Sequence, residues 1–253
     1  MNDETPYISG TGTADRSLDL EQGHLLPPAP DPDRRPLVVS PSAPRAIEWA
    51  ADRIIGGGLI AFPTDTVYAL AASLAHTDAL DRLLAVKRRP PGKPIPVLLA
   101  TAAALDSVAQ DLDPHLRELA GRFWPGPLTV AVPARSGMPP ATVAPDGTIG
   151  ARVPNHFLAI ELIERAGGAV AATSANRAGG TPPRDADAVL AALGTDLDLL
   201  VDGGPTPGGV ASTVIALRDG AIVILREGDI PGEVLLAAWD ELRAAHADPP
   251  LPR

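Results

Sequence analysis

Two hydrophobic periods divide most of this chain into strands and helices. Short apolar runs bounded by glycine, proline or polar residues predict buried strands, whereas apolar residues spaced three or four positions apart predict helices. Strands are predicted at 37–39, 59–62, 95–99, 128–132, 148–153, 169–172, 197–201, 212–217 and 221–225. Helices are predicted at 43–56, 77–87 with Thr77 as N-cap, 101–110, 114–123, 157–166, 185–193 and 231–246. Because the segments largely alternate, the pattern predicts an α/β sheet with helices on both faces.

One domain, residues 37–246, is predicted between two polar ends. Segments 1–36 and 247–253 contain many prolines and little apolar periodicity. Such a composition buries too little apolar surface to order itself, so we expect a disordered or loosely held N-terminal tail and a short C-terminal tail. Asp219 and Gly220 separate the last two predicted strands and are typical of a hairpin turn. The sheet should therefore be mixed rather than purely parallel.

Composition narrows the class of protein. The chain has 253 residues, no cysteine and a formal net charge of −10. The lack of cysteine excludes disulfides and thiolate metal sites and favours a cytoplasmic location. No apolar run approaches the ~20 residues that span a bilayer, so no membrane is expected. The negative charge argues against wholesale wrapping of nucleic acid, which needs many cations.

Polar side chains interrupt or follow the predicted strands in five places. In an α/β sheet, the loops beyond strand ends usually carry the chemistry, because the scaffold holds them rigidly. The five places are Thr64-Asp65-Thr66 between two apolar runs, the loop 87–93, residues 148–156, residues 174–176, and residues 212–213 with Arg226. We expect the functional site among them.

The loop 87–93 is a candidate anion site. Its sequence, KRRPPGK, holds four cations, including both lysines of the chain. A solvated helix end would also favour cations, by ~0.3–1 kcal/mol, through the helix dipole. Two prolines and a glycine stiffen this loop, however, and preorganise its lysine and arginine for an anion such as a polyphosphate.

Two other places have both a structural and a ligand-binding interpretation. Ser174 and Asn176 directly follow a predicted strand, where they could stabilise a turn or contact a ligand, and we weigh the two about equally. Alternation puts Thr148 and Arg152 on one face of their strand. Arg152 needs an anionic partner, which could be an internal carboxylate or a substrate carboxylate. His156 is expected to begin a helix rather than to catalyse.

Several familiar signatures are absent from the sequence. It contains no P-loop, no Gly-x-Ser-x-Gly nucleophile elbow and no histidine pair with metal-ligand spacing. The glycine-rich run GGPTPGG at 203–209 lacks the dinucleotide-binding fingerprint. The sequence therefore favours neither covalent catalysis nor a dedicated metal site.

The order of the polar motifs resembles the YrdC family. From 46 to 230 the chain carries, in sequence, PTDTVYAL, a Lys-x-Arg at 87–89, WPGPLT, an Arg-Val-Pro-x-His at 152–156, SAN, STV and a Leu-Arg-x-Gly at 225–228. The resemblance implies a YrdC-like fold, a twisted open mixed α/β sheet with a concave cleft. It also implies the short form, without the additional C-terminal domain of longer relatives.

The resemblance further implies an activity. Family members include L-threonylcarbamoyladenylate synthases, nucleotidyltransferases that form threonylcarbamoyl-AMP and pyrophosphate from L-threonine, bicarbonate and ATP. The product serves the threonylcarbamoyladenosine modification of tRNA, so a tRNA threonylcarbamoyl transferase would be the downstream partner. Mg²⁺ would be carried by the ATP phosphates without a dedicated protein site, and direct RNA binding would be weak.

The resemblance assigns roles to residues of this chain. Lys87 and Arg89 would be catalytic and would handle the ATP phosphates. Thr64 and Arg152 would bind threonine. The rest of the ATP site would comprise Thr148, Ser174, Asn176, Ser212 and Arg226.

Two alternatives stay open. Ala69, Leu98 and Ala178 stand where many relatives carry other residues, which leaves room for a paralogue that acts on another carbamate or acyl-adenylate. A non-catalytic RNA-binding module is the other alternative. The charge of −10 and the three phenylalanines and two tyrosines argue against it, because single-strand recognition relies on basic stripes and aromatic platforms.

Overall fold

The computed structural model of the chain describes residues 36–88 and 92–246. The predicted tails at 1–36 and 247–253 therefore lie outside the described residues, apart from Pro36. Arg89, one of the two predicted catalytic residues, lies outside them as well.

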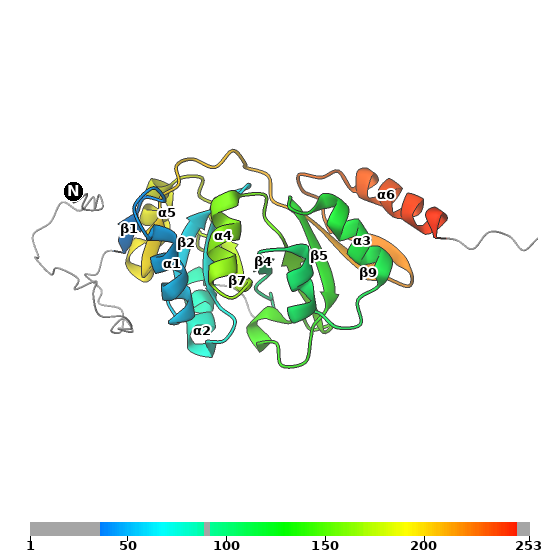
Figure 1. Ribbon diagram of the computed structural model, residues 1–253, viewed down its shortest axis with the longest axis horizontal. Coiled ribbons are helices and arrows are strands. Elements are labelled where there is room, and N and C mark those ends of the chain that lie inside the picture. The colour runs from blue at the N-terminus through cyan, green and yellow to red at the C-terminus, as the bar shows by residue number, and fades with distance from the viewer. Residues whose placement is uncertain (1–35, 89–91, 247–253) are drawn as a thin grey trace, which may run out of the picture.

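Ten strands form one sheet, in the order β1-β8-β2-β3-β7-β4-β6-β5-β9-β10 (Figure 1). They are β1 (Leu37–Val39), β2 (Ile60–Pro63), β3 (Tyr68–Ser73), β4 (Val97–Leu99), β5 (Leu128–Pro133), β6 (Thr148–Arg152), β7 (Ala169–Ser174), β8 (Leu199–Val201), β9 (Thr213–Arg218) and β10 (Ala221–Arg226). The connection between β8 and β9, residues 202–212, crosses from the second strand of this order to the ninth (Figure 1).

The sheet is mixed, as the sequence predicts, but antiparallel pairing extends beyond the terminal hairpin. β2 pairs with β3 as a hairpin in which Pro63 faces Tyr68. The pairs β3–β7, β4–β7 and β5–β6 are also antiparallel, whereas β1–β8, β2–β8, β4–β6 and β5–β9 are parallel. The polar segment 64–67 is therefore a hairpin turn between two buried strands.

Six α-helices lie within the described residues. They are α1 (Ala46–Ile55), α2 (Thr77–Lys87), α3 (Pro114–Phe123), α4 (Phe157–Arg165), α5 (Ala186–Leu193) and α6 (Gly232–Ala245). Aspartate caps mark the starts of two of them: the Asp113 carboxylate accepts from the Leu116 amide (3.0 Å) at the start of α3, and the Asp185 carboxylate accepts from the Ala188 amide (2.8 Å) at the start of α5. In the part of the chain that the structure describes, no helix has the length and apolar character needed to cross a bilayer.

Two details of the predicted helices are wrong. The N-cap of α2 is His76, whose backbone is extended, and Thr77 is the first helical residue. The segment 101–110 contains only a 3-10 helix, η1 (Ala102–Ser107), instead of an α-helix. There the Ser107 hydroxyl donates to the Ala104 carbonyl (2.7 Å), and the Val108 amide turns to the Leu105 carbonyl instead (3.1 Å). The hydroxyl thus competes with α-helical continuation.

Apolar clusters cover both faces of one half of the sheet. α1 and α4 lie side by side over one face of β2, β3 and β7, where Phe62 and Val170 are buried (Figure 1). α2 and α5 cover the opposite face, where Leu70 and Ala171 are buried. These strands are therefore apolar on both faces, which explains why they read as continuous apolar runs.

The other half of the sheet consists of β6, β5 and β9. These strands contribute side chains to an apolar cluster on one face only. Val130, Ala151 and Ile215 pack there with α3 and α6. The alternate residues of these strands point to the second face, and none of them belongs to the three apolar clusters of the described chain. We call this the small-residue face; it includes Thr129, Ala131, Thr148, Gly150, Arg152, Val214 and Ala216.

Candidate functional site

The end of α2 brings Lys87 to the end of β7. The Lys87 ammonium donates to the Ser174 carbonyl (2.6 Å) and to Asn176 Oδ1 (3.2 Å), and it lies 3.4 Å from the Ser174 hydroxyl. The Lys87 residue is only 3% exposed. Three of the predicted ATP-site residues, from segments far apart in the sequence, therefore form one buried group.

The turn between β2 and β3 satisfies its own hydroxyl groups. Thr64 Oγ1 donates to the Val67 carbonyl (2.7 Å) and accepts from the Thr66 and Val67 amides (3.2 and 3.3 Å). It also lies 3.1 Å from Thr66 Oγ1. The hydroxyl groups thus hold the hairpin turn locally, and a contact between Thr64 and threonine stays a prediction.

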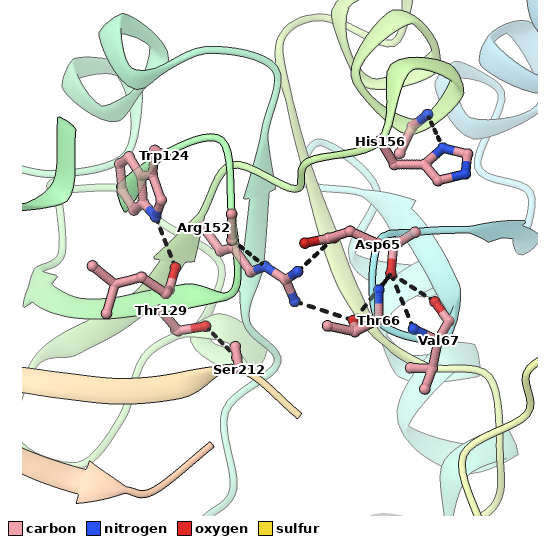
Figure 2. Close-up of polar contacts among 12 residues, drawn as sticks. Asp65, Thr66, Val67, Trp124, Thr129, Arg152, His156 and Ser212 are labelled. Carbon is pink, nitrogen blue, oxygen red and sulfur yellow. Dashed lines mark hydrogen bonds and ion pairs between the residues drawn. The ribbon is translucent and has the colours of Figure 1, made fainter. Parts of the chain in front are cut away.

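Arg152 is held beside this turn by an internal carboxylate. Its Nη2 lies 2.5 Å from Asp65 Oδ1, its Nε donates to the Gly126 carbonyl (2.9 Å), and its Nη1 donates to Thr66 Oγ1 (3.3 Å) (Figure 2). Arg152 is 7% exposed. Burial lowers the pKa of its guanidinium, and the charge of Asp65 partly offsets that effect. Asp65 is therefore a partner of Arg152, and it is the internal carboxylate that the sequence left as one of two options.

Ser212 and Arg226 form a third group next to Arg152. The Ser212 hydroxyl lies 2.8 Å from Thr129 Oγ1, and Arg226 Nη2 donates to the Ser212 carbonyl (2.7 Å) and hydroxyl (3.1 Å). Burial lowers the pKa of Arg226, and the positive charge of Arg152 lowers it further. In Figure 2 the Arg152 guanidinium lies between the Asp65 turn and the Thr129–Ser212 pair. Two neighbouring guanidinium groups at the edge of the small-residue face are suited to an anionic ligand.

The structure does not bring Thr148 to these groups. Thr148 begins β6 and Arg152 ends it, so about 13 Å of strand separates them. The Thr148 hydroxyl donates to Asp146 Oδ1 (2.6 Å), and Asp146 also pairs with Arg218 (3.0 Å). These residues line a cavity of about 280 Å³ at the end of the strand, with Asp111. A contact between Thr148 and ATP stays a prediction, as does the role of Arg89.

His156 begins α4, as the sequence predicts. Its Nδ1 accepts from the Ala159 amide (3.4 Å) at the start of the helix. Burial lowers the pKa of His156, and the nearby charge of Asp65 raises it in part. The ring therefore serves as a helix cap in the neutral form.

Gly126 and the loop 203–209 also border the site, although neither was predicted to. The Gly126 carbonyl accepts from Arg152, and a β-carbon at Gly126 would collide with the Phe123 carbonyl. A β-carbon at Gly208 would collide with the backbone of Thr66, so the glycine-rich loop lies directly on the hairpin turn. The glycines next to proline in WPGPLT and GGPTPGG could have indicated these two close contacts, because glycine often stands where two backbone segments approach each other.

Comparison with known proteins adds independent information. A family model described as Sua5_yciO_yrdC, telomere recombination, matches residues 52–228. A protein named threonylcarbamoyl-AMP synthase from Pyrococcus abyssi is 36% identical over 203 residues, which cover 79% of this chain and 60% of that protein. A putative threonylcarbamoyl-AMP synthase from Mycobacterium tuberculosis (strain H37Rv) is 32% identical over 189 residues, which cover 75% of this chain and 87% of that protein.

Solved structures of the same family resemble the fold of this chain. A crystal structure of P. abyssi Sua5 complexed with L-threonine matches with a TM-score of 0.75 and 35% identity, covering 79% of this chain and 59% of that one. The chain thus spans about 60% of the length of the Pyrococcus proteins that it resembles.

Proposed function

This chain belongs to the Sua5/YciO/YrdC family, and on that premise we propose that it is an L-threonylcarbamoyladenylate synthase. In the proposed reaction, L-threonine, bicarbonate and ATP give threonylcarbamoyl-AMP and pyrophosphate. The product would pass in the cytoplasm to a tRNA threonylcarbamoyl transferase, which modifies adenosine in tRNA. The relatives named threonylcarbamoyl-AMP synthase support this proposal.

The observation that carries the proposal is the environment of Arg152. A buried guanidinium already holds a carboxylate, Asp65, at the edge of a sheet face made of small residues. The carboxylate of an amino acid has the same charge and geometry as that of Asp65, so it can take the place of Asp65 on this guanidinium. We assign this end of the site to threonine, with Thr64 in the adjoining turn.

The phosphates of ATP would lie between Lys87 and the two guanidinium groups. The threonine amine and bicarbonate form a carbamate with loss of water. A carbamate oxygen attacks the α-phosphorus, and the bond to the pyrophosphate oxygen breaks. Lys87, Arg89 and Arg226 would stabilise the negative charge of the phosphates, with Ser174, Asn176 and Ser212 around them. Proximity and charge stabilisation suffice for this chemistry, because no covalent enzyme intermediate is needed.

Mg²⁺ belongs to the substrate in this proposal. The described side chains near the site are cations, hydroxyl groups, one amide and two carboxylates: Asp65, which Arg152 engages, and Asp229, whose charge also acts on Arg152. Within residues 36–88 and 92–246, histidine and acidic side chains form no group suited to a metal ion. This donor set fits a metal ion carried by ATP, which would neutralise the phosphates and keep most of its waters.

The test is pyrophosphate release from ATP with bicarbonate, with amino acids added one at a time. We expect release that depends on L-threonine, together with threonylcarbamoyl-AMP detected by mass spectrometry. Arg152→Ala should abolish threonine dependence, whereas Arg165→Ala, a change at a surface arginine paired with Glu161, should not. Release with another amino acid would instead assign a paralogue, and tRNA binding without any turnover would assign an RNA-binding module.

A further inference from the structure

The turn between α3 and β5 carries the sequence WPGP, residues 124–127, to which the proposed function assigns no role. The Trp124 indole donates to the Leu128 carbonyl (2.7 Å), and this bond spans the turn (Figure 2). Trp124 is 8% exposed and belongs to the apolar cluster that packs with α3 and α6. The indole therefore anchors the turn to the apolar side of the sheet and closes it with a hydrogen bond.

The same turn holds the end of β6. The Gly126 amide donates to the Val153 carbonyl (2.9 Å), and the Gly126 carbonyl accepts from Arg152 Nε (2.9 Å). Gly126 thus uses both of its backbone groups to bond two consecutive residues. Only glycine fits there without a shift of the chain, because a β-carbon would collide with the Phe123 carbonyl. The turn and the guanidinium are therefore joined through a closely packed main-chain segment.

Arg152 has partners of two kinds on its two sides. The terminal nitrogens Nη1 and Nη2 bond side chains of the hairpin turn, Thr66 and Asp65. The Nε group has a single proton, and that proton is donated to the main-chain carbonyl of Gly126. A substrate carboxylate can take the place of a side chain, but the carbonyl stays. The Gly126 carbonyl therefore leaves only the two terminal nitrogens for a carboxylate.

We propose that Trp124 is a positioning residue for the amino-acid substrate. It holds the WPGP turn so that the Gly126 carbonyl orients the Arg152 guanidinium, and the substrate carboxylate binds both terminal nitrogens of that guanidinium. The inference rests on the proposed function, which puts threonine at Arg152. Trp124 itself does not touch the substrate; it acts through Gly126.

Steady-state kinetics of the full chain separates this role from a general loosening of the fold. Trp124→Phe keeps an aromatic ring and removes the indole N–H. It should raise the KM for L-threonine about three- to tenfold, the usual effect of one hydrogen bond. Both kcat and the KM for ATP should change by less than about twofold, because the threonine carboxylate does not react and is bound equally in the ground state and the transition state.

The matched control is Trp239→Phe. Trp239 is 4% exposed and belongs to the same apolar cluster, but it lies on α6, outside the turn. The control makes the same change of side-chain size, and it should leave kcat and both KM values close to those of wild type. An equal rise of the threonine KM in Trp124→Phe and Trp239→Phe would overturn the proposal.

A double-mutant cycle tests the route through the guanidinium. Arg152→Lys has no Nε–H group for the Gly126 carbonyl, so the further change Trp124→Phe should leave the affinity for L-threonine unchanged in that background. NMR titration with L-threonine measures these affinities without turnover. A further loss as large as in the wild-type background would show that Trp124 acts by another route, and the proposal would fall.

A last measurement needs no substrate. In protein labelled in its arginine side chains, the Nε–H signal of Arg152 is identified by its loss in Arg152→Lys. Trp124→Phe should shift this NMR signal and speed the exchange of its proton with water, while Trp239→Phe leaves both nearly unchanged. An Arg152 signal that is the same in Trp124→Phe and wild type would refute the positioning role. If wild-type protein failed to use threonine, the proposed function would fall, and this measurement would still decide whether Trp124 orients Arg152.

Discussion

The two halves of the sheet differ in what packs against them. β2, β3 and β7 are enclosed between helices, with apolar clusters on both faces. β6, β5 and β9 pack on α3 and α6 with one face, and on the other they present small residues and the buried Arg152. The first half stabilises the fold, and the second has the small side chains that a ligand needs to approach a sheet. Changes in the two halves should therefore separate stability from activity.

The largest effect is expected at Arg152, where the two halves meet. Arg152→Ala should reduce pyrophosphate release at least about a hundredfold, because truncating one member of a buried charge pair costs several kcal/mol. It should also destabilise the fold, by at most about 3–5 kcal/mol, since it leaves the partly buried Asp65 carboxylate (side chain 12% exposed) without its partner. Urea unfolding measures the second effect.

A control separates these two causes. The double variant Asp65→Ala/Arg152→Ala should recover much of the stability of Arg152→Ala and none of the activity. Full activity in a folded Arg152→Ala protein would contradict the assignment of the site.

The next effect belongs to the enclosed half. Leu70 lies in β3, is fully buried and packs with the α2 and α5 cluster. Leu70→Ala should destabilise the protein by about 2–5 kcal/mol, because the cavity collapses only in part. At urea concentrations below its unfolding transition, the Leu70→Ala protein should keep the specific activity of wild type. Val214→Ala, on the small-residue face, is the matched change and should cost less than about 1 kcal/mol. Equal losses of stability at the two positions would contradict the claim that the enclosed half contributes more to the stability of the fold.

A smaller effect is expected from the hydroxyl pair on the small-residue face. Thr129→Val removes the hydrogen bond to Ser212 and should cost about 1 kcal/mol of stability. It should also reduce pyrophosphate release several-fold, because Ser212, which holds Arg226, loses a fixed partner. Thr142→Val is the control: it removes a similar buried bond, to the Pro139 carbonyl (2.8 Å), outside the three groups of the site. Equal activities of the two variants would remove Ser212 from the site.

The smallest effect concerns pH. Burial lowers the pKa of His156 below its ordinary value of 6.5, so unfolding takes up a proton in the window below that value. Stability is then complete above pH 6.5 and decreases as the pH falls toward the lowered pKa of the folded state. His156→Asn keeps a helix-capping side chain and should lose less stability than wild type between pH 7 and pH 5, as measured by urea midpoints. Parallel pH profiles would show that His156 does not titrate on unfolding.

Local features of the fold followed from the sequence, and non-local ones did not. α3 has the predicted bounds, 114–123, because Asp113, Pro114 and the proline after Trp124 mark both ends. The pairing of β1 with β8 joins segments far apart in the chain, and no local pattern specifies such a partner. The segment 101–110 was predicted as an α-helix, yet it is a 3-10 helix in which the Ser107 hydroxyl takes the Ala104 carbonyl at its end.

The candidate site was predictable in its parts and less so in its geometry. The sequence put Lys87, Ser174 and Asn176 in one site, and the structure brings them together. Alternation correctly put Thr148 on the same face as Arg152, but sharing a face does not mean sharing an end of the strand. The partner of Arg152 stayed open because a single sequence cannot distinguish an internal carboxylate from that of a substrate.

The order of the strands has a consequence for the synthesis of this protein. Leu37 in β1 pairs with Leu199 in β8, and Ile60 in β2 pairs with the same residue of β8. At about 5–20 residues per second, a ribosome makes these partners on the order of ten seconds apart. During that interval the β2–β3 hairpin can form, while the other edge of β2 stays unpaired until β8 has been made. Nascent chains that end before residue 199 should therefore expose an apolar strand edge and be the preferred clients of chaperones, whereas longer chains can close the sheet.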